Sequence, residues 1–313
     1  MRILVVGAGA VGGYFGGRML AAGRDVTFLV QPQRAALLAK NGLVIKSPVS
    51  DLVLPQPPTV LSEQLKSSYD LIILSCKAYD LDDAINSFAA AVGEQTMILP
   101  LLNGMRHLES LEQRFGKDKV LGGQCAISST VDAQGAIFHL APMHALTFGE
   151  RDGSVTDRAR QVLAVMSGAG YDPQLSENIM QSMWEKWVLL ASLAGSTSLM
   201  RSSIGDIMEA PGGQQFVLDL LAECSSVATA AGHPPGIGFL QQLRGLLTTA
   251  GSPLTASMFR DIENRARIEA DQIIGNLIER EHSLGLKETG LPLLRLVYTH
   301  LKSYEARSRR SAA

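Results

Sequence analysis

The chain has 313 residues, 46% of them hydrophobic, and a formal net charge of −2 at pH 7. This length is enough for two domains with separate cores. The near-neutral charge provides no basic field for nucleic acid or an anionic membrane, so neither is expected as a partner. Met1 leads directly into an apolar segment, and no apolar run is long enough to span a bilayer, so we expect a cytoplasmic protein.

The cysteines and histidines give no sign of a metal site or a disulfide framework. Cys76, Cys125 and Cys224 stand far apart, and no C-x-x-C occurs. The six histidines show no metal-ligand spacing. The sequence therefore predicts free thiols and no bound metal.

The first stretch predicts a strand, a tight turn and a helix. Residues 2–6 are mostly apolar and favour a strand, and they lead into Gly7-Ala8-Gly9-Ala10-Val11-Gly12. In such a turn the first glycine permits the bend, the second lets the backbone approach a pyrophosphate, and the third lets helix and strand pack closely. The helix N-terminus adds N–H groups and a positive dipole end. A second strand at 25–30 completes the pattern, which predicts dinucleotide binding; the alternative is a glycine-rich turn without a cofactor.

The residues after the second strand bear on the choice of cofactor. An Asp or Glu there would bind the ribose 2′-hydroxyl of NAD. This chain instead has Val30-Gln31-Pro32-Gln33-Arg34. A guanidinium suits a 2′-phosphate by charge and by its fork of donors, so Arg34 favours NADP over NAD. The alternative is that Arg34 is an ordinary solvated residue at a helix start.

Strand and helix patterns continue to alternate through the first half. We expect strands at 43–46, 51–54, 69–75, 96–102, 120–128, 135–140, 146–149 and 171–176, and helices at 81–92 and 154–167. Lys77 and Asn103 each follow a buried strand, at the edge where ligands collect in open α/β sheets. Both are candidate cofactor contacts, and the Asn103 amide can also hydrogen-bond a substrate carbonyl. A solvated loop lysine is the alternative for Lys77.

From residue 178 onward the pattern is helical. We therefore expect an α/β fold with a Rossmann-type dinucleotide-binding domain at 1–177, followed by an all-α domain at 178–313. One long helix is expected at 179–199 and another at 261–284. The inner face of the first carries Met183, Trp184, Trp187, Leu190, Leu193 and Ala194, and that of the second Ile262, Ala266, Ile273 and Leu277.

Each of these faces also carries one charged residue. Lys186 shares the first face and Glu269 the second, by helical spacing. Charges on apolar faces are costly unless they are paired or lie at a cleft, which suggests a Lys–Glu pair at the domain interface. Lys186 would protonate a carbonyl oxygen during hydride transfer, with Glu269 tuning its pKa. The alternative is that both side chains extend to water from the helix edges.

Taken together, the motifs resemble the ketopantoate reductase (2-dehydropantoate 2-reductase) family over nearly the whole chain. The matching segments are Gly7 to Gly12, Cys76-Lys77-Ala78-Tyr79, Asn103-Gly104-Met105, Trp184-Glu185-Lys186-Trp187, and Ala256-Ser257-Met258-Phe259-Arg260-Asp261 followed by Glu269. The first is common among dinucleotide binders, whereas the later four are more specific in this order. The resemblance implies NADPH-dependent reduction of 2-dehydropantoate to pantoate, in pantothenate biosynthesis.

The resemblance also assigns residue roles. Lys186 matches the general acid, Glu269 the active-site glutamate, and Ser257 a contact to the substrate carboxylate. Lys77 and Asn103 match cofactor contacts, with Asn103 close to the reacting centre as well. Ser129 falls near a backbone contact to the cofactor. The family binds its substrate in the cleft between the two domains. Many proteins of this fold class form pairs through the helical domain, so a homodimer is one possible state of this chain.

Several positions depart from the family pattern. Leu190, Ala194, Ile204 and Leu254 stand where the family has asparagines, and Gln31 where it usually has an arginine. Losing a buried hydrogen-bond partner costs about 1–3 kcal/mol, so 2-dehydropantoate should bind more weakly. Ser192, Ser196 or Thr197 would restore polar contacts if the helix were rotated. Two alternatives therefore remain: the same chemistry on a less polar 2-oxo acid, and a non-catalytic NADP-binding regulator.

Overall fold

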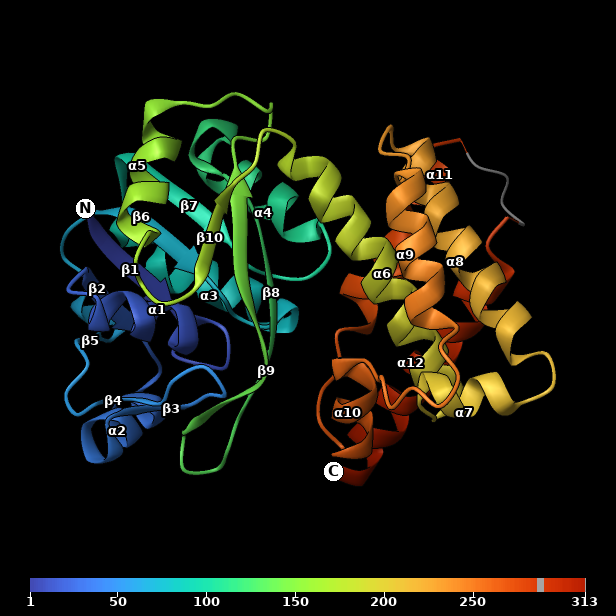
Figure 1. The fold of residues 1–313 in the computed structure, drawn as a ribbon. Coiled ribbons are helices and arrows are strands. Elements are labelled where there is room, and N and C mark those ends of the chain that lie inside the picture. Colours follow the sequence, from blue (N-terminus) through green and yellow to red (C-terminus); the bar gives the residue numbers. More distant parts are fainter. Residues whose placement is uncertain (286–289, 313) are drawn as a thin grey trace. The chain divides into compact units, whose positions relative to one another are not determined.

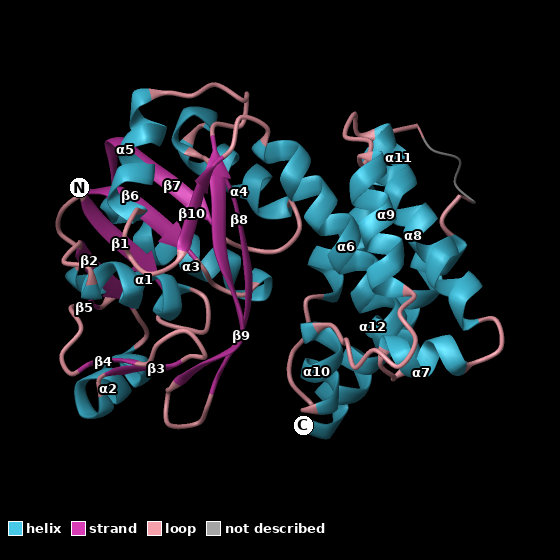
Figure 2. Cartoon of the chain, viewed as in Figure 1, coloured by secondary structure: helices cyan, strands magenta, loops and turns pink. Residues whose placement is uncertain are grey.

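The computed structural model describes residues 1–285 and 290–312, which form two compact units. The first comprises Met1–Leu102 and His107–Met180, and the second Asn103–Arg106 and Gln181–Ala313. Every strand in the described part of the chain belongs to the first unit (Figure 2). The segment Asn103–Arg106, which we placed in the first domain, groups with the second unit. No described helix is both long and apolar enough to cross a membrane.

A parallel sheet of five strands forms the centre of the first unit, in the order β5-β2-β1-β6-β7. Its strands are β1 (Arg2–Val6), β2 (Asp25–Leu29), β5 (Thr59–Val60), β6 (Tyr69–Leu74) and β7 (Val92–Pro100). The central strands are buried apolar runs, as is typical of parallel sheets covered on both faces. From β1 the chain builds outward to β2 and β5, and then returns to the other side of β1 with β6. Such a switch point places a ligand site beyond the carboxyl ends of β1 and β6.

The remaining strands form a second, mixed sheet in the order β10-β9-β3-β4, with β8 paired to β9. They are β3 (Leu43–Lys46), β4 (Leu52–Leu54), β8 (Gly122–Val131), β9 (Ile137–Gly149) and β10 (Asp172–Leu175). The two strands expected at 135–140 and 146–149 are one strand, because β9 continues through Pro142. The register between β8 and β9 shifts there, and a proline is tolerated at such a bulge.

Five α-helices accompany these sheets (Figure 1): α1 (Gly12–Ala21), α2 (Pro32–Asn41), α3 (Leu81–Phe88), α4 (Arg106–Phe115) and α5 (Asp157–Met166). Helix α1 packs closely on strands of both sheets because of its glycines. A Cβ at Gly16 would lie 2.7 Å from the Phe28 ring of β2, and one at Gly17 would lie 2.7 Å from Leu43 of β3. The glycines thus fix the depth at which α1 sits, and with it the start of the helix.

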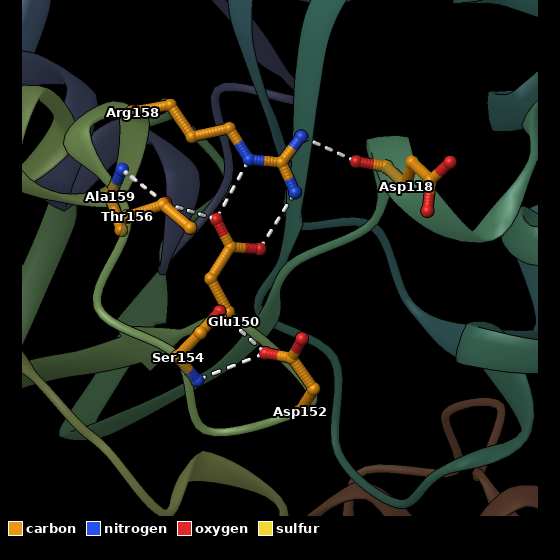
Figure 3. A network of polar contacts seen from close by, with 7 residues as sticks. All are labelled: Asp118, Glu150, Asp152, Ser154, Thr156, Arg158 and Ala159. Atoms are coloured by element: carbon orange, nitrogen blue, oxygen red, sulfur yellow. Dashed lines mark hydrogen bonds and ion pairs between the residues drawn. The ribbon is translucent and has the colours of Figure 1, made fainter.

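A polar network secures the start of α5 (Figure 3). The Thr156 hydroxyl accepts a hydrogen bond from the Ala159 N–H and donates one to the Glu150 carboxylate. The same buried carboxylate accepts two further bonds, of 2.7 Å each, from Nε and Nη2 of Arg158, whose Nη1 donates to the Asp118 carbonyl. These bonds from Arg158, helped by Thr156, hold the pKa of Glu150 below its usual value. The network ties α5 to the end of β9 and to the turn before β8.

The second unit is helical: α6 (Ile179–Met200), α7 (Ile204–Glu209), α8 (Gly213–Ala230), α9 (Ile237–Leu247), α10 (Ser257–Glu263), a π-helix (Asp271–Gly275), α11 (Asn276–Ser283) and α12 (Pro292–Ala312).

The prediction of a single helix at 261–284 is wrong. Helix α10 ends at Glu263, and Arg265 then adopts a left-handed backbone with φ of 55°. Ala266, which we expected on the inner face, is exposed. The chain becomes helical again only after Glu269. Glu269 therefore does not continue the buried stripe of Ile262, but lies two residues before the first residue of the π-helix.

Candidate functional site

The glycine loop follows β1 at the switch point of the parallel sheet. Gly7 has a φ of 93°, in the left-handed region that favours glycine. A Cβ at Gly12 would lie 2.1 Å from Ser75 Oγ and 2.3 Å from the Gly7 carbonyl oxygen, so only glycine fits there. A Cβ at Gly9 would meet nothing within 4 Å, so this side of the loop is open. The geometry thus suits the expected roles: a turn at Gly7, close packing at Gly12, and room for a ligand at Gly9.

Two side chains hold the carbonyl groups of this loop. Arg34 donates to the Ala8 carbonyl from Nε (3.0 Å) and Nη2 (2.6 Å), and to the Gly135 carbonyl from Nη1 (2.9 Å). Ser129 Oγ donates to the Ala10 carbonyl at 3.1 Å. In a trans peptide the N–H points opposite to the carbonyl. The N–H groups that follow Ala8 and Ala10 are therefore directed away from Arg34 and Ser129, where a phosphate could accept from them.

Arg34 therefore has a structural task that the sequence did not reveal. Three of its five N–H donors are used on backbone carbonyls, which leaves two for a 2′-phosphate. Burial lowers the pKa of Arg34, but a guanidinium stays protonated at physiological pH. The predicted phosphate contact remains chemically available, while the main observed role is to brace the loop.

Lys77 lies at the carboxyl end of β6, the strand beside β1. Its side chain is exposed, and it directly precedes the 3₁₀ turn Ala78–Asp80. Two residues earlier, Ser75 Oγ donates to the Val6 carbonyl at 3.0 Å and so joins the ends of β1 and β6. Lys77 is thus placed at the same sheet edge as the glycine loop. Sequence reasoning missed Ser75, because a serine after a strand carries no specific signal.

In the second unit, the segments that carry Lys186 and Glu269 are bonded to the same π-helix. Lys186 is half-buried on α6, and its neighbour Trp187 donates from the indole N–H to the Ile273 carbonyl at 2.9 Å. The Ile273 N–H donates to the Glu269 carbonyl at 3.0 Å. Glu269 is also half-buried. The segments that carry these two charged residues, far apart in the sequence, are therefore both bonded to Ile273 of the π-helix.

Asn103 is attached to the same π-helix. The Gln272 side-chain amide donates to the Asn103 carbonyl at 2.8 Å. Gly104 has a φ of 74°, and a Cβ there would lie 2.9 Å from the Gln272 carbonyl oxygen, so the loop can approach only with glycine at this position. Asn103 is half-buried beside this contact. Sequence reasoning missed Gln272, since 169 residues separate it from Asn103.

Ser257 is the first residue of α10, and its side chain is exposed. The residue before it, Ala256, donates its N–H to Thr197 Oγ1 on α6 at 3.3 Å. The start of α10 is thereby fixed to the helix that carries Lys186. Among the residues that the structure describes, no hydrogen bond links Ser257 to the π-helix.

The four positions that depart from the family pattern form two apolar pairs. Leu190 and Ala194 follow Lys186 by one and two turns of α6, with Leu190 half-buried and Ala194 buried. Ile204 and Leu254 lie together, because the Ile204 N–H donates to the Leu254 carbonyl at 3.0 Å. In residues 1–285 and 290–312, no group of His, Cys, Asp and Glu side chains is arranged to hold a metal ion.

Comparison with known protein families identifies the family of this chain. The family model for ketopantoate reductase PanE/ApbA matches residues 3–153, and that for its C-terminal region matches residues 178–305. The chain belongs to the ketopantoate reductase family. This confirms the resemblance found in the sequence and places the protein among oxidoreductases. The Rossmann-type domain followed by a helical domain is the architecture of this family.

Individual relatives span nearly the full chain. The uncharacterized oxidoreductase YkpB of Bacillus subtilis (strain 168) is 36% identical over 306 residues, covering 98% of this chain and 99% of its own. A 2-dehydropantoate 2-reductase of Nostoc sp. is 24% identical, covering 98% and 96%.

Two solved structures show the shared fold of this ketopantoate reductase family member. The 2-dehydropantoate 2-reductase from Geobacter metallireducens GS-15 superposes with a TM-score of 0.87 at 25% identity, covering 97% of this chain and 99% of its own. A D-mandelate dehydrogenase, solved with NADH and anilino(oxo)acetate, has a TM-score of 0.85 at 19% identity, covering 99% and 100%. At 19% identity this second likeness concerns the fold alone.

Proposed function

We propose that this ketopantoate reductase family member reduces a 2-oxo acid to the 2-hydroxy acid with NADPH. The observation that carries the proposal is the attachment of the Lys186, Glu269 and Asn103 segments to one π-helix in the second unit. The first unit supports it with a glycine loop whose N–H groups are directed for phosphate binding. The loop fits the cofactor because Gly9 leaves space for a pyrophosphate.

The roles of the residues follow from their chemistry. Bound NADPH supplies the hydride that the carbonyl carbon receives. Lys186 donates a proton from its ammonium group to the carbonyl oxygen, so that the ketone becomes a hydroxyl group. The Glu269 carboxylate orients the lysine. Ser257 donates a hydrogen bond to the substrate carboxylate, and the Asn103 amide positions the reacting groups.

The preference for NADP rests on the end of β2. No carboxylate follows this strand at Val30 or Gln31, so the usual acceptor for the NAD ribose 2′-hydroxyl is missing. Arg34 adds positive charge close to the glycine loop. We therefore expect the protein to use NADPH in preference to NADH.

A less polar 2-oxo acid than 2-dehydropantoate is the second candidate substrate. Leu190 and Ala194 follow Lys186 on α6 and offer no hydrogen bond to a substrate hydroxyl. Ser192, Ser196 and Thr197, which were the candidates to replace the missing amides, are fully buried. A site that lacks these partners loses its strongest means of selecting a hydroxylated substrate.

The test is oxidation of NADPH by the purified protein with 2-dehydropantoate and with aliphatic and aromatic 2-oxo acids, repeated with NADH. We expect turnover with NADPH, and a higher kcat/KM for an apolar 2-oxo acid than for 2-dehydropantoate. Lys186→Ala should lower kcat by about a hundredfold or more, as loss of a general acid does. Lys66→Ala, at an exposed lysine of the first unit, is the control. Tight NADPH binding without turnover of any 2-oxo acid would contradict the proposal and favour a binding protein.

A further inference from the structure

Three consecutive residues at the start of the π-helix each hold a different part of the second unit. The Asp271 carboxylate accepts hydrogen bonds from Tyr298 (2.6 Å) and Lys302 (3.0 Å) of α12. Gln272 holds the Asn103 carbonyl, and the Ile273 carbonyl accepts from the Trp187 indole of α6. Successive residues of a helical turn point in different directions, so one turn can contact three elements. The π-helix thereby fixes α6, α12 and the Asn103 loop to one another.

The turn is anchored independently of Gln272. Although burial raises the pKa of Asp271, the bonds from Tyr298 and Lys302 outweigh it and keep the pKa below its usual value. A Cβ at Gly275 would lie 3.0 Å from the Tyr298 ring, so glycine lets α12 pack against the turn. Isolated π-turns occur frequently at functional sites. Removing the Gln272 amide should leave these other anchors in place.

Gln272 determines where the Asn103 loop lies. Gln272 is only 5% exposed, and a buried amide is costly without hydrogen-bond partners. The Asn103 carbonyl supplies such a partner at 2.8 Å. At Gly104 the loop backbone approaches Gln272 so closely that any side chain would collide with it. The loop and Gln272 are therefore complementary in shape and in hydrogen bonding.

We propose that Gln272 is a positioning residue of the reaction, which sets the place of the Asn103 amide relative to the cofactor and substrate. This inference rests on the function proposed above. Gln272 acts through the backbone of Asn103 and needs no contact with the substrate. Small displacements of a positioned group cost up to about a hundredfold in rate, so one such bond can matter for catalysis.

A double-mutant cycle tests the inference. Gln272→Met keeps a similar length but removes the donor, and Asn103→Ala removes the side-chain amide while keeping the carbonyl that Gln272 binds. We expect Gln272→Met to lower kcat/KM by about tenfold or more, Asn103→Ala to lower it further, and the double variant to match Asn103→Ala. A merely structural effect of Gln272 would persist in the Asn103→Ala background. Multiplicative losses, or an unchanged kcat/KM in Gln272→Met, would overturn the proposal.

Controls separate this outcome from misfolding and from failure of the proposed function. Gln241→Met, at an exposed glutamine on α9, should keep the wild-type kcat/KM, and melting temperatures of all variants are measured in parallel. If Gln272→Met does not fold, Gln272→Glu is the second variant, since an ionised carboxylate cannot donate to the carbonyl. If the wild type turns over no 2-oxo acid, the proposed function fails. NADPH dissociation constants are then measured for the same single and double variants. If the losses in binding free energy of the two single variants add up in the double variant, the role of Gln272 is overturned.

Discussion

At the scale of single residues, Arg34 shows one side chain that serves both loop structure and cofactor choice. Its guanidinium joins the Ala8 and Gly135 carbonyls, and two N–H groups remain free for a 2′-phosphate. We expect Arg34→Met to weaken NADH binding by about tenfold, because a hydrogen bond to a charged group contributes about 1.5–3 kcal/mol. NADPH binding should fall further, since the positive charge is lost too. Dissociation constants for both cofactors, from fluorescence titration, measure this.

The comparison between cofactors is what distinguishes the two roles. If Arg34 served only the 2′-phosphate, NADH affinity would not change in Arg34→Met, and the bracing role would be refuted. Arg34→Lys keeps the charge but not the planar fork that spans two carbonyls, so it should also lose NADH affinity. Arg114→Met, at an exposed arginine of α4, is the matched control and should bind both cofactors as the wild type does.

At the scale of elements, a hydrogen bond between a tyrosine and a histidine joins α1 to β9. The buried Tyr14 hydroxyl of α1 lies 2.6 Å from His144 Nδ1 of β9. Burial lowers the pKa of His144, and the nearby His139 and Arg18 lower it further, against a smaller opposing effect of Asp172. In the unfolded chain a histidine titrates at about pH 6.5. The folded state therefore binds this proton less readily than the unfolded state, and its contribution to stability is complete above that pH and declines as the pH falls below it.

We expect the melting temperature of the wild type to fall when the pH is lowered from about 7.5 to about 5.5, through the range in which the unfolded histidine titrates. His144→Gln, which can still accept from the Tyr14 hydroxyl, should show a smaller fall. Burial also lowers the pKa of His233 and His300 in the second unit, so part of the decline will persist in this variant. Equal declines in the two proteins would show that His144 does not contribute.

Local patterns predicted most elements of the first unit but not the shape of the second unit around Glu269. Strands such as β3 and β6, and the glycine loop, carry their signal in adjacent residues. The predicted helix at 261–284 failed because its apolar spacing fits a continuous helix, whereas the left-handed backbone at Arg265 breaks it. A positive φ is uncommon for a residue other than glycine, so no sequence pattern announces this break. The continuity of β9 was missed for a similar reason, because Pro142 lies at the register shift between β8 and β9 and does not end the strand.

Candidate site residues were likewise predicted where the signal lies in adjacent residues, and missed where it depends on distant ones. The glycine loop, Lys186 and Glu269 were found from spacing and family resemblance. The residues that hold them were not, because Gln272 and Trp187 act on partners that are distant in the sequence. An arginine at a helix start likewise looks solvated until Gly135, on a distant turn, comes to lie against it. Sequence reasoning thus identified reactive groups and missed the contacts that position them.

At the scale of the whole molecule, the division into two units implies that each can respond separately to a destabilising change. Both tryptophans, Trp184 and Trp187, are buried in the second unit, so their fluorescence reports on that unit alone. The Glu150–Arg158 pair lies entirely in the first unit (Figure 3). Perturbing this pair therefore tests whether unfolding of the first unit is transmitted to the second.

Glu150→Gln should lower the free energy of unfolding of the first unit by about 2 kcal/mol, since charge-assisted bonds to Arg158 are weakened at a buried position. Arg160→Ala is the matched control on the same helix. Arg160 pairs with Asp157, whose side chain is 91% exposed, so its loss should cost less than about 0.5 kcal/mol. In urea, Glu150→Gln should shift the unfolding transition followed by far-ultraviolet circular dichroism, while the tryptophan transition stays at the wild-type midpoint. An equal shift in both signals would mean that the two units unfold as one cooperative system.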